Sequence, residues 1–218
     1  MEKSKATVAT LTFNPFQENT YIVYDETGEC VIVDPGCWDK REKEELKAFI
    51  ESHHLKPVRL LNTHCHIDHI FGNHFVAGTW DLPLEVHRGE LPVLESAPAT
   101  AAYFGVPHFD PSPAPGRFIE ADEDIRFGNT VLKALLMPGH SPASLSYFSE
   151  NDRFLLSGDV LFWQSIGRTD LPGGDWETLV KSIREQIFTT PDDTRLLSGH
   201  GPETTVGEEK RSNPFVGF

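Results

Sequence analysis

Residues 62–69 read N-T-H-C-H-I-D-H, which places three histidines, a cysteine and an aspartate within eight positions. Imidazole, thiolate and carboxylate groups are the side chains with which proteins bind transition metals. The stretch follows Val58–Leu61, a short apolar run that predicts a buried strand. Open α/β sheets present their reactive groups where a strand ends and a loop begins. The stretch therefore predicts a metal site at a strand end in an α/β protein.

The four histidine and aspartate side chains of this stretch do not fit a single metal ion. His64 and His66 are two residues apart and can point the same way, because side chains alternate along an extended chain. Cys65 would then point the opposite way, as a small buried side chain instead of a ligand. Asp68 and His69 follow a turn and reach the same cavity from another side. Because these four groups cannot converge on one tetrahedron, they indicate parts of two sites.

Three further candidate ligands each follow a glycine at the end of an apolar run. Glycine lets the backbone turn tightly and approach an ion closely. The repeated arrangement predicts that these residues complete the two sites. They are His140 in the segment PGH at 138–140, Asp159 in SGD at 157–159 and His200 in SGH at 198–200.

The apolar patterns of the whole chain predict strands and helices in two successive runs. Expected strands cover 6–13, 20–24, 29–33, 58–61, 84–87, 131–137, 145–148, 154–157 and 194–197. Expected helices cover 39–52, about 69–77, about 89–95 and about 175–188. Five prolines in 96–118 predict a loop or lid there. The order of elements predicts one α/β domain over residues 1–218, with two sheets covered on the outside by helices.

Composition and charge restrict the partners. The formal net charge of −14 argues against nucleic acid, whose binding depends on lysine and arginine neutralising phosphates. No run of about 18 apolar residues predicts a membrane span. The first residues lack the apolar core of a secretory signal, and three cysteines form no disulfide framework. We therefore expect a cytoplasmic protein that acts on a small molecule, with its oligomeric state left open.

The motif HxHxDH at 64–69, followed by PGH, GD and GH, resembles the metallo-β-lactamase superfamily. The resemblance extends from VIVDPG at 31–36 to GHGP at 199–202 and implies a four-layer αββα sandwich. It also implies that Asp34 orients a ligand without binding metal itself. The ligand sets implied by the resemblance are His64, His66 and His140 for one metal, Asp68, His69 and His200 for the other, and Asp159 as the bridge between them.

The resemblance implies two divalent metal ions as cofactors. Zinc is the first expectation, with iron or manganese as alternatives, because histidine and carboxylate sites accept all three. Two such ions a few ångströms apart can lower the pKa of a bridging water and polarise a carbonyl.

Within the superfamily, the segments MPGHSPAS at 137–144 and GDVLFWQSIGRTDLPGGD at 158–175 resemble the glyoxalase II branch. The tail from GHGP onwards resembles its single-domain members. Arg168 lies nine residues after Asp159, where that branch has a basic residue that contacts the glutathione part of the substrate. Two features depart from the branch: Asp170 stands where the branch has an aromatic residue, and we do not expect residues 1–218 to include the helical domain that binds glutathione there.

The reaction implied by this resemblance is hydrolysis of a small thioester. An S-2-hydroxyacylglutathione or similar thioester would give a hydroxy acid and a thiol through attack by a metal-bridging hydroxide. Asp68 would orient the hydroxide and Arg168 would position the substrate. The main alternative is an iron-dependent persulfide dioxygenase, whose motifs THCHADH and GRTD are similar and whose single iron would be bound by His64, His140 and Asp159. A metal-binding scaffold without catalysis is a third reading.

Overall fold

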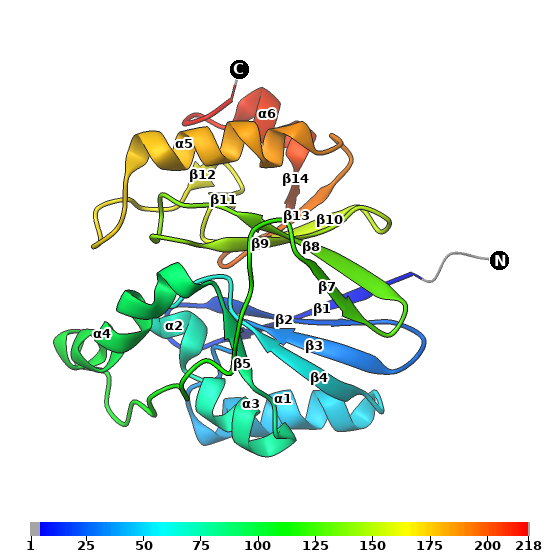
Figure 1. The fold of residues 1–218 in the computed structure, drawn as a ribbon, viewed down its shortest axis with the longest axis vertical. Helices are drawn as coiled ribbons and strands as arrows, with labels where there is room; N and C mark the ends of the chain where they lie inside the picture. The colour runs from blue at the N-terminus through cyan, green and yellow to red at the C-terminus, as the bar shows by residue number, and fades with distance from the viewer. Residues whose placement is uncertain (1–4, 218) are drawn as a thin grey trace.

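Two six-stranded sheets pack face to face in the computed structural model, which describes residues 5–217 (Figure 1). The first sheet has the order β1-β2-β3-β4-β5-β6. β1, β2 and β3 are antiparallel neighbours, whereas β4, β5 and β6 each pair in parallel with the strand before them. The strands are β1 (Thr7–Phe13), β2 (Glu18–Tyr24), β3 (Glu29–Val33), β4 (Lys56–Leu61), β5 (Leu84–Val86) and β6 (Arg117–Phe118).

The second sheet has the order β14-β13-β10-β9-β8-β7. Its neighbours are antiparallel except for β10 and β13, which run parallel. A short two-stranded ribbon, β11 with β12, follows β10. The strands are β7 (Asp124–Phe127), β8 (Thr130–Leu136), β9 (Leu145–Ser149), β10 (Phe154–Gly158), β11 (Leu161–Phe162), β12 (Ser165–Ile166), β13 (Arg195–Ser198) and β14 (Thr204–Thr205).

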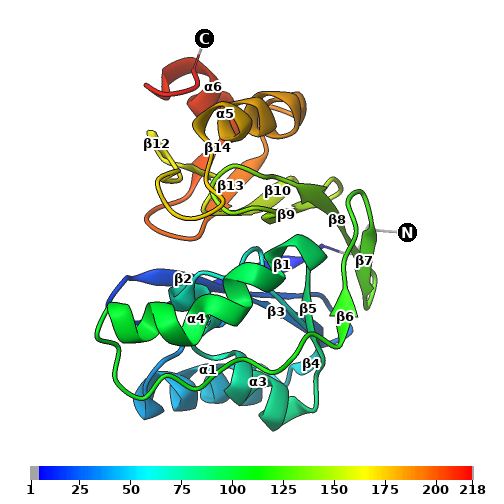
Figure 2. The ribbon, with the colours of Figure 1, turned by 60° about the vertical axis from the view of Figure 1, so that its left-hand side comes forward.

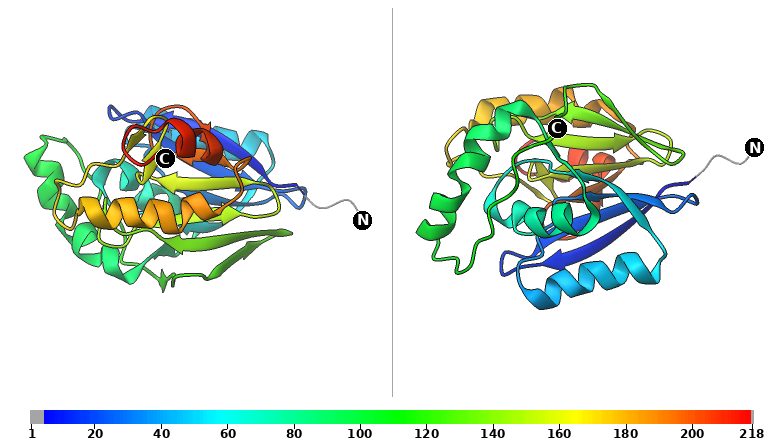
Figure 3. Two further views of the ribbon diagram at one scale, coloured as in Figure 1. Left: turned by 90° about the horizontal axis from the view of Figure 1, so that it is seen from above. Right: turned by 60° about the horizontal axis from the view of Figure 1, so that its bottom comes forward.

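Helices cover the outer faces of both sheets, which gives the four layers α, β, β and α (Figures 1 and 2). α1 (Lys40–Ser52) and α3 (Asn73–Trp80) cover the first sheet, and α5 (Trp176–Glu185) and α6 (Val206–Ser212) cover the second. α4 (Leu91–Tyr103) lies at the end of the sandwich opposite the β7–β8 turn (Figure 3). The remaining helical pieces are α2 (Ile67–Ile70), η1 (Arg88–Glu90) and η2 (Ile187–Thr189). The predicted αββα architecture is confirmed.

Side-chain alternation in the central strands explains the layers. Along β3, Val31 and Val33 belong to the apolar cluster between the two sheets, whereas Cys30 and Ile32 belong to the cluster beneath α1. A strand buried on both faces reads as a continuous apolar run, as this one does. Tyr147 of β9 is fully buried between the sheets, and its hydroxyl donates to the carbonyl of Asn62 over 2.8 Å. This bond joins β9 of the second sheet to the first residue of the NTHCHIDH stretch, which directly follows β4 of the first sheet.

The expectation of a loop over 96–118 is wrong for its first part, because α4 continues to Tyr103. Pro98 lies inside this helix, where it lacks the N–H that would bond to the carbonyl four residues earlier. Its neighbours are mostly alanines, the best helix formers, and Ala97 and Ala101 are buried. Burial of this alanine face outweighs the loss of one hydrogen bond, and only the part after Tyr103 lacks helix.

The helix expected near 69–77 is divided into α2 and α3. Gly72 separates them, and its N–H donates to the carbonyl of Pro35 over 2.7 Å. A Cβ at Gly72 would lie 2.5 Å from the sulfur of Cys37, so the chain after β3 passes directly against this point. The tight approach requires glycine and interrupts the helix.

None of the helices in residues 5–217 is long and apolar enough to cross a membrane.

α5 is attached at its N-terminus to the loop that carries His140. Asp175 caps the helix by accepting from the N–H of Thr178 over 2.8 Å, and its own N–H donates to the carbonyl of Gly139 over 2.7 Å. Gly139 has a φ of 130°, and a Cβ there would lie 2.3 Å from the nitrogen of Leu179. The helix end thus holds this loop close to the second sheet.

Replacement of Asp175 by alanine should lower the free energy of unfolding by about 1 kcal/mol, since a lost N-cap leaves a helix N–H without its partner. Denaturant unfolding followed by circular dichroism measures this. The exposed Asp193, which caps no helix, supplies the matched control Asp193→Ala, for which we expect no change. Equal midpoints for Asp175→Ala and the unsubstituted protein would contradict the role given to the cap.

Candidate metal centre

The candidate ligands lie at the carboxyl ends of strands from both sheets, as the sequence predicts. His64 and His66 follow β4, and Asp68 and His69 lie in α2 directly after them. The other three follow strands of the second sheet: His140 after β8, Asp159 after β10 and His200 after β13. The face-to-face packing of the sheets brings these strand ends together.

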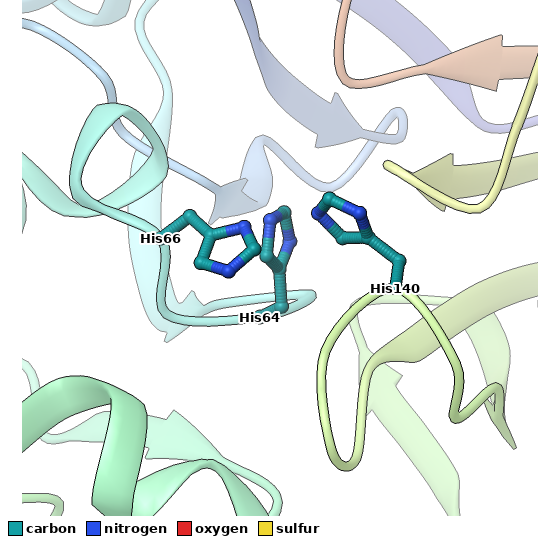
Figure 4. A group of neighbouring side chains, drawn as sticks. All are labelled: His64, His66 and His140. Atoms are coloured by element: carbon teal, nitrogen blue, oxygen red, sulfur yellow. The ribbon is translucent and has the colours of Figure 1, made fainter. Parts of the chain in front are cut away.

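The first group consists of His64, His66 and His140, whose nearest ring nitrogens lie within 4.8 Å of one another (Figure 4). The ring centroids are 4.6 to 4.9 Å apart, and the rings stand nearly perpendicular. Figure 4 shows the three rings converging from two different loops. Three imidazoles in this arrangement match the His₃ ligand set of catalytic zinc sites.

The second group consists of Asp68, His69 and His200, whose ligand atoms also lie within 4.8 Å of one another. The Nε2 atom of His200 is 3.1 Å from the Oδ2 atom of Asp68, and the Nε2 atom of His69 is 3.7 Å from the same oxygen. Two imidazoles and a carboxylate form another common set of metal ligands.

Asp159 lies between the two groups. Its Oδ1 atom is 3.4 Å from Nε2 of His69, and its Oδ2 atom is 3.7 Å from Nε2 of His140 and 3.5 Å from Nε2 of His200. One carboxylate thus faces ligands of both groups, as a bridging ligand must. The assignment of Asp159 as the bridge remains a prediction that this geometry supports.

The outer nitrogens of three histidines are fixed by oxygen acceptors. Nδ1 of His140 pairs with the carbonyl of Arg168 at 2.8 Å, and Nδ1 of His200 pairs with the carbonyl of Phe16 at 3.0 Å. Nδ1 of His69 pairs with the carboxylate of Asp34 at 3.1 Å. Because Nδ1 carries the donated proton in such pairs, Nε2 of each ring is the nitrogen left to face the centre.

Asp34 supports ligands from outside the centre. Its Oδ1 atom accepts from the N–H of Thr63 over 2.6 Å, and its Oδ2 atom accepts from the hydroxyl of Thr63 and from His69. The Thr63 hydroxyl in turn lies 2.9 Å from Nδ1 of His64. Asp34 is also close enough to His64 and His69 to form a third group of possible ligands. Its oxygens are already occupied by these hydrogen bonds, so the geometry favours the predicted orienting role.

Several ligand atoms at the centre are buried and have no hydrogen-bond partner among the described residues. They are Nε2 of His64, His69 and His140, and Oδ1 of Asp159. A buried polar atom without a partner costs about 1–3 kcal/mol, and four facing one another are not expected by accident. Metal cations would satisfy all four, so the residues present fit a metal centre.

The electrostatics at His64, His66 and Asp159 favour the protonation states that metal ligands need, whereas the carboxylates beside His69 favour its protonated form when no metal is bound. Burial, together with the neighbouring imidazoles, lowers the pKa of His64 well below its usual value and that of His66 to about 3. Burial also acts on His69, but Asp159 and Asp68 outweigh it and raise the pKa of His69. Burial would raise the pKa of Asp159, yet His69 and other imidazoles hold it well below its usual value. The lowered pKa values of His64 and His66 favour neutral imidazoles, and that of Asp159 favours the carboxylate.

Glycine is needed beside the centre at position 199. A Cβ there would lie 2.1 Å from Oδ1 of Asp159 and 2.7 Å from Cε1 of His69. The SGH segment thus has its glycine because the backbone passes directly against two candidate ligands.

A pocket of about 260 Å³ opens over the two groups. Its polar floor includes His66, Asp68, Asp159 and His200, and Arg168 lies at its rim with more than half of its side chain exposed. Part of its apolar wall comes from α4, whose residues beyond 95 the proline pattern predicted to be a loop. The apolar lining consists of Phe16, Ile67, Val93, Ala97, Phe104 and Leu171, with Cys65 beside them.

Three further residues with imidazole or thiol side chains lie outside the ligand groups. Cys65 packs with the apolar cluster beneath the first sheet, and burial raises the pKa of its thiol. His87 caps η1, and His108 lines a separate pocket at the surface. Glu90 was missed altogether: it is buried and bonds to both histidine loops. Its segment HRGE matches no motif, and no spacing links it to either loop.

Comparisons with known proteins agree with this geometry. The family described as the metallo-beta-lactamase superfamily matches residues 13–200. A probable metallo-hydrolase of Bacillus subtilis, YqgX, is 40% identical over 204 residues, covering 93% of each chain. A hydroxyacylglutathione hydrolase of Haemophilus influenzae, GloC, is 35% identical and covers 92% of this chain and 93% of its own.

Solved structures show the same fold. The B3 metallo-β-lactamase BLEG-1 has a TM-score of 0.88 at 36% identity, covering 96% of this chain and 99% of its own. The protein TTHA1623, solved in a di-iron-bound form, has a TM-score of 0.86 at 37% identity, covering 95% and 100%. The family match, the fold and the two ligand groups lead to one conclusion: the chain belongs to the metallo-β-lactamase superfamily of metal-dependent hydrolases.

Proposed function

We propose that this protein hydrolyses a small thioester at a dinuclear metal centre, in the manner of a hydroxyacylglutathione hydrolase. The observation that carries the metal part is the meeting of two ligand groups around Asp159, with four buried ligand atoms unpartnered. The thioester part is supported by the similarity to the hydroxyacylglutathione hydrolase GloC and by Arg168 at the pocket rim.

Different residues would bind the metals, orient the attacking water and position the substrate. His64, His66 and His140 would hold one metal and Asp68, His69 and His200 the other, with Asp159 shared. When bound, such a pair of ions activates water at neutral pH and polarises the substrate carbonyl. Asp68, at the pocket floor, would orient the attacking water by accepting its hydrogen bond. Arg168 would position the polar end of the substrate.

The apolar wall of the pocket contributes by excluding water from the reacting carbonyl. Val93 and Ala97 of α4, and Phe104 directly after it, line one side of the pocket. A dry surface on this side strengthens the electrostatic interactions within the site. It also provides a place for the non-reacting part of the acyl group or thiol.

The direct test uses the protein loaded with zinc, iron or manganese. Hydrolysis of S-lactoylglutathione is monitored through the release of free thiol. A chromogenic cephalosporin is tested in parallel, and glutathione persulfide is tested with an oxygen electrode. We expect thiol release without oxygen uptake. Oxygen consumption with the persulfide would replace the proposal by the dioxygenase reaction. Turnover of the cephalosporin alone would replace it by β-lactam hydrolysis.

Asp170 should weaken the interaction of Arg168 with an anionic substrate. Both Nε and Nη2 of Arg168 donate to the Asp170 carboxylate, at 2.7 and 2.8 Å. Because exposed ion pairs contribute about 0.2–1 kcal/mol, Asp170→Asn should raise kcat/KM for S-lactoylglutathione by roughly 1.4- to five-fold. The effect should appear in KM and shrink at high salt. A fall in kcat/KM would show that the pair, not the free arginine, binds the substrate.

A further inference from the structure

Glu90 is a buried carboxylate that joins the two loops carrying the first ligand group. It is 1% exposed and lies at the junction of η1 and α4. One of its oxygens, Oε2, accepts from the N–H of Cys65 over 3.0 Å. The other, Oε1, accepts from the N–H of Ala143 over 2.8 Å. The hydroxyl of Ser141 lies 2.6 Å from both.

These donors belong to the metal-binding loops themselves. Cys65 lies between His64 and His66, and Ser141 follows His140 directly. One carboxylate therefore bonds to the backbone of the first loop and to the backbone and a hydroxyl of the second. The hydrogen bonds described for Glu90 in residues 5–217 include none to Asp68, His69 or His200.

Burying a carboxylate costs free energy unless hydrogen-bond donors satisfy its oxygens. The bonds described for Glu90 come from neutral donors, with no arginine or lysine among them. Hydrogen bonds to an ionised acceptor are about twice as strong as neutral ones and are directional. Three such donors from two loops fix the distance between the loops more tightly than apolar contact would.

We propose that Glu90 is a positioning residue for one half of the metal centre: it sets the spacing of His64 and His66 relative to His140, and so the metal affinity of that half-site. The other half-site does not depend on it. The inference rests on the proposed dinuclear centre, but not on the identity of the substrate.

Substitution by glutamine tests this with little change in shape. A glutamine has one acceptor oxygen and one NH₂ donor, whereas the N–H groups of Cys65 and Ala143 approach different oxygens. In either orientation of the amide, one of these two N–H groups would face another donor. Glu90→Gln should therefore loosen one loop without opening a cavity.

The experiment measures zinc affinity at each half-site separately by calorimetric titration of the full chain. The variant His200→Ala weakens the second half-site and leaves the first for measurement, and His140→Ala does the reverse. Adding Glu90→Gln should raise the zinc Kd roughly 10- to 100-fold in the His200→Ala background, the usual cost of removing a group that orients metal ligands. In the His140→Ala background the Kd should stay within about three-fold, because the bonds that position the second half-site are intact.

Two further variants keep the test decisive. Ser141→Ala removes one donor and leaves the carboxylate in place, so it should raise the first-site Kd less than Glu90→Gln does. Glu95→Gln, an exposed change one turn further along α4, should raise neither Kd. Equal losses at both half-sites, or no loss at the first, would overturn the proposal. Absence of thioester hydrolysis would leave these affinities unaffected and would bear on the proposed substrate alone.

Discussion

Replacement of Asp159 by alanine should abolish metal occupancy and catalysis together. Asp159 faces both ligand groups, with oxygens 3.7 Å from Nε2 of His140 in the first group and 3.4 Å from Nε2 of His69 in the second. Its loss removes the negative charge that would reduce the repulsion between two bound metal ions. We expect kcat/KM to fall by about 10²–10³-fold or more, the effect of removing a preorganised charge from a catalytic site.

The change is measured by metal analysis of the purified variant beside its thioesterase activity. Asp193→Ala, at an exposed position outside both ligand groups, is the matched control and should keep both metals and full turnover. An Asp159→Ala protein with two bound metals and undiminished activity would show that the assignment of Asp159 is wrong.

Removal of the metals should destabilise the fold strongly. The ligands come from strands of both sheets, and three ring nitrogens at the centre are buried without partners. Ligands that bind only the folded state stabilise it by about 2.7–4.1 kcal/mol at 100–1,000 times their Kd, which for a chain of this size predicts a fall in Tm of about 5–15 °C on chelation.

Differential scanning calorimetry before and after exhaustive chelation measures this fall. Addition of zinc to the chelated protein should restore the original Tm, which separates metal loss from damage by the treatment. A chelated protein with an unchanged Tm would mean that the buried imidazoles are satisfied without a cation.

The sequence predicts the candidate ligands well because they form local patterns. His64, His66, Asp68 and His69 lie within six residues, and the three distant ligands each follow a glycine at a strand end. Strand ends are readable from apolar runs, and packing of the sheets then brings these ends together. The four layers follow from the same runs, since strands such as β3 are buried on both faces.

The pocket wall and the supporting contacts are less predictable, because they depend on packing between distant segments. Pro98 indicates a loop, yet the buried face of Ala97 and Ala101 retains the helix that forms the wall. Glu90 has no local signal, since its partners Cys65 and Ser141 are 25 and 51 residues away. A residue that joins two loops by hydrogen bonds in this way is recognised only from the three-dimensional structure.

The most direct test of the dinuclear centre is the number of metal ions per chain. The protein, stripped of metal and titrated with zinc in a calorimeter, should bind two equivalents, and His140→Ala and His200→Ala should each lose one. A single equivalent that survives His200→Ala but not His140→Ala would contradict a two-metal centre and leave only the first ligand group as a site.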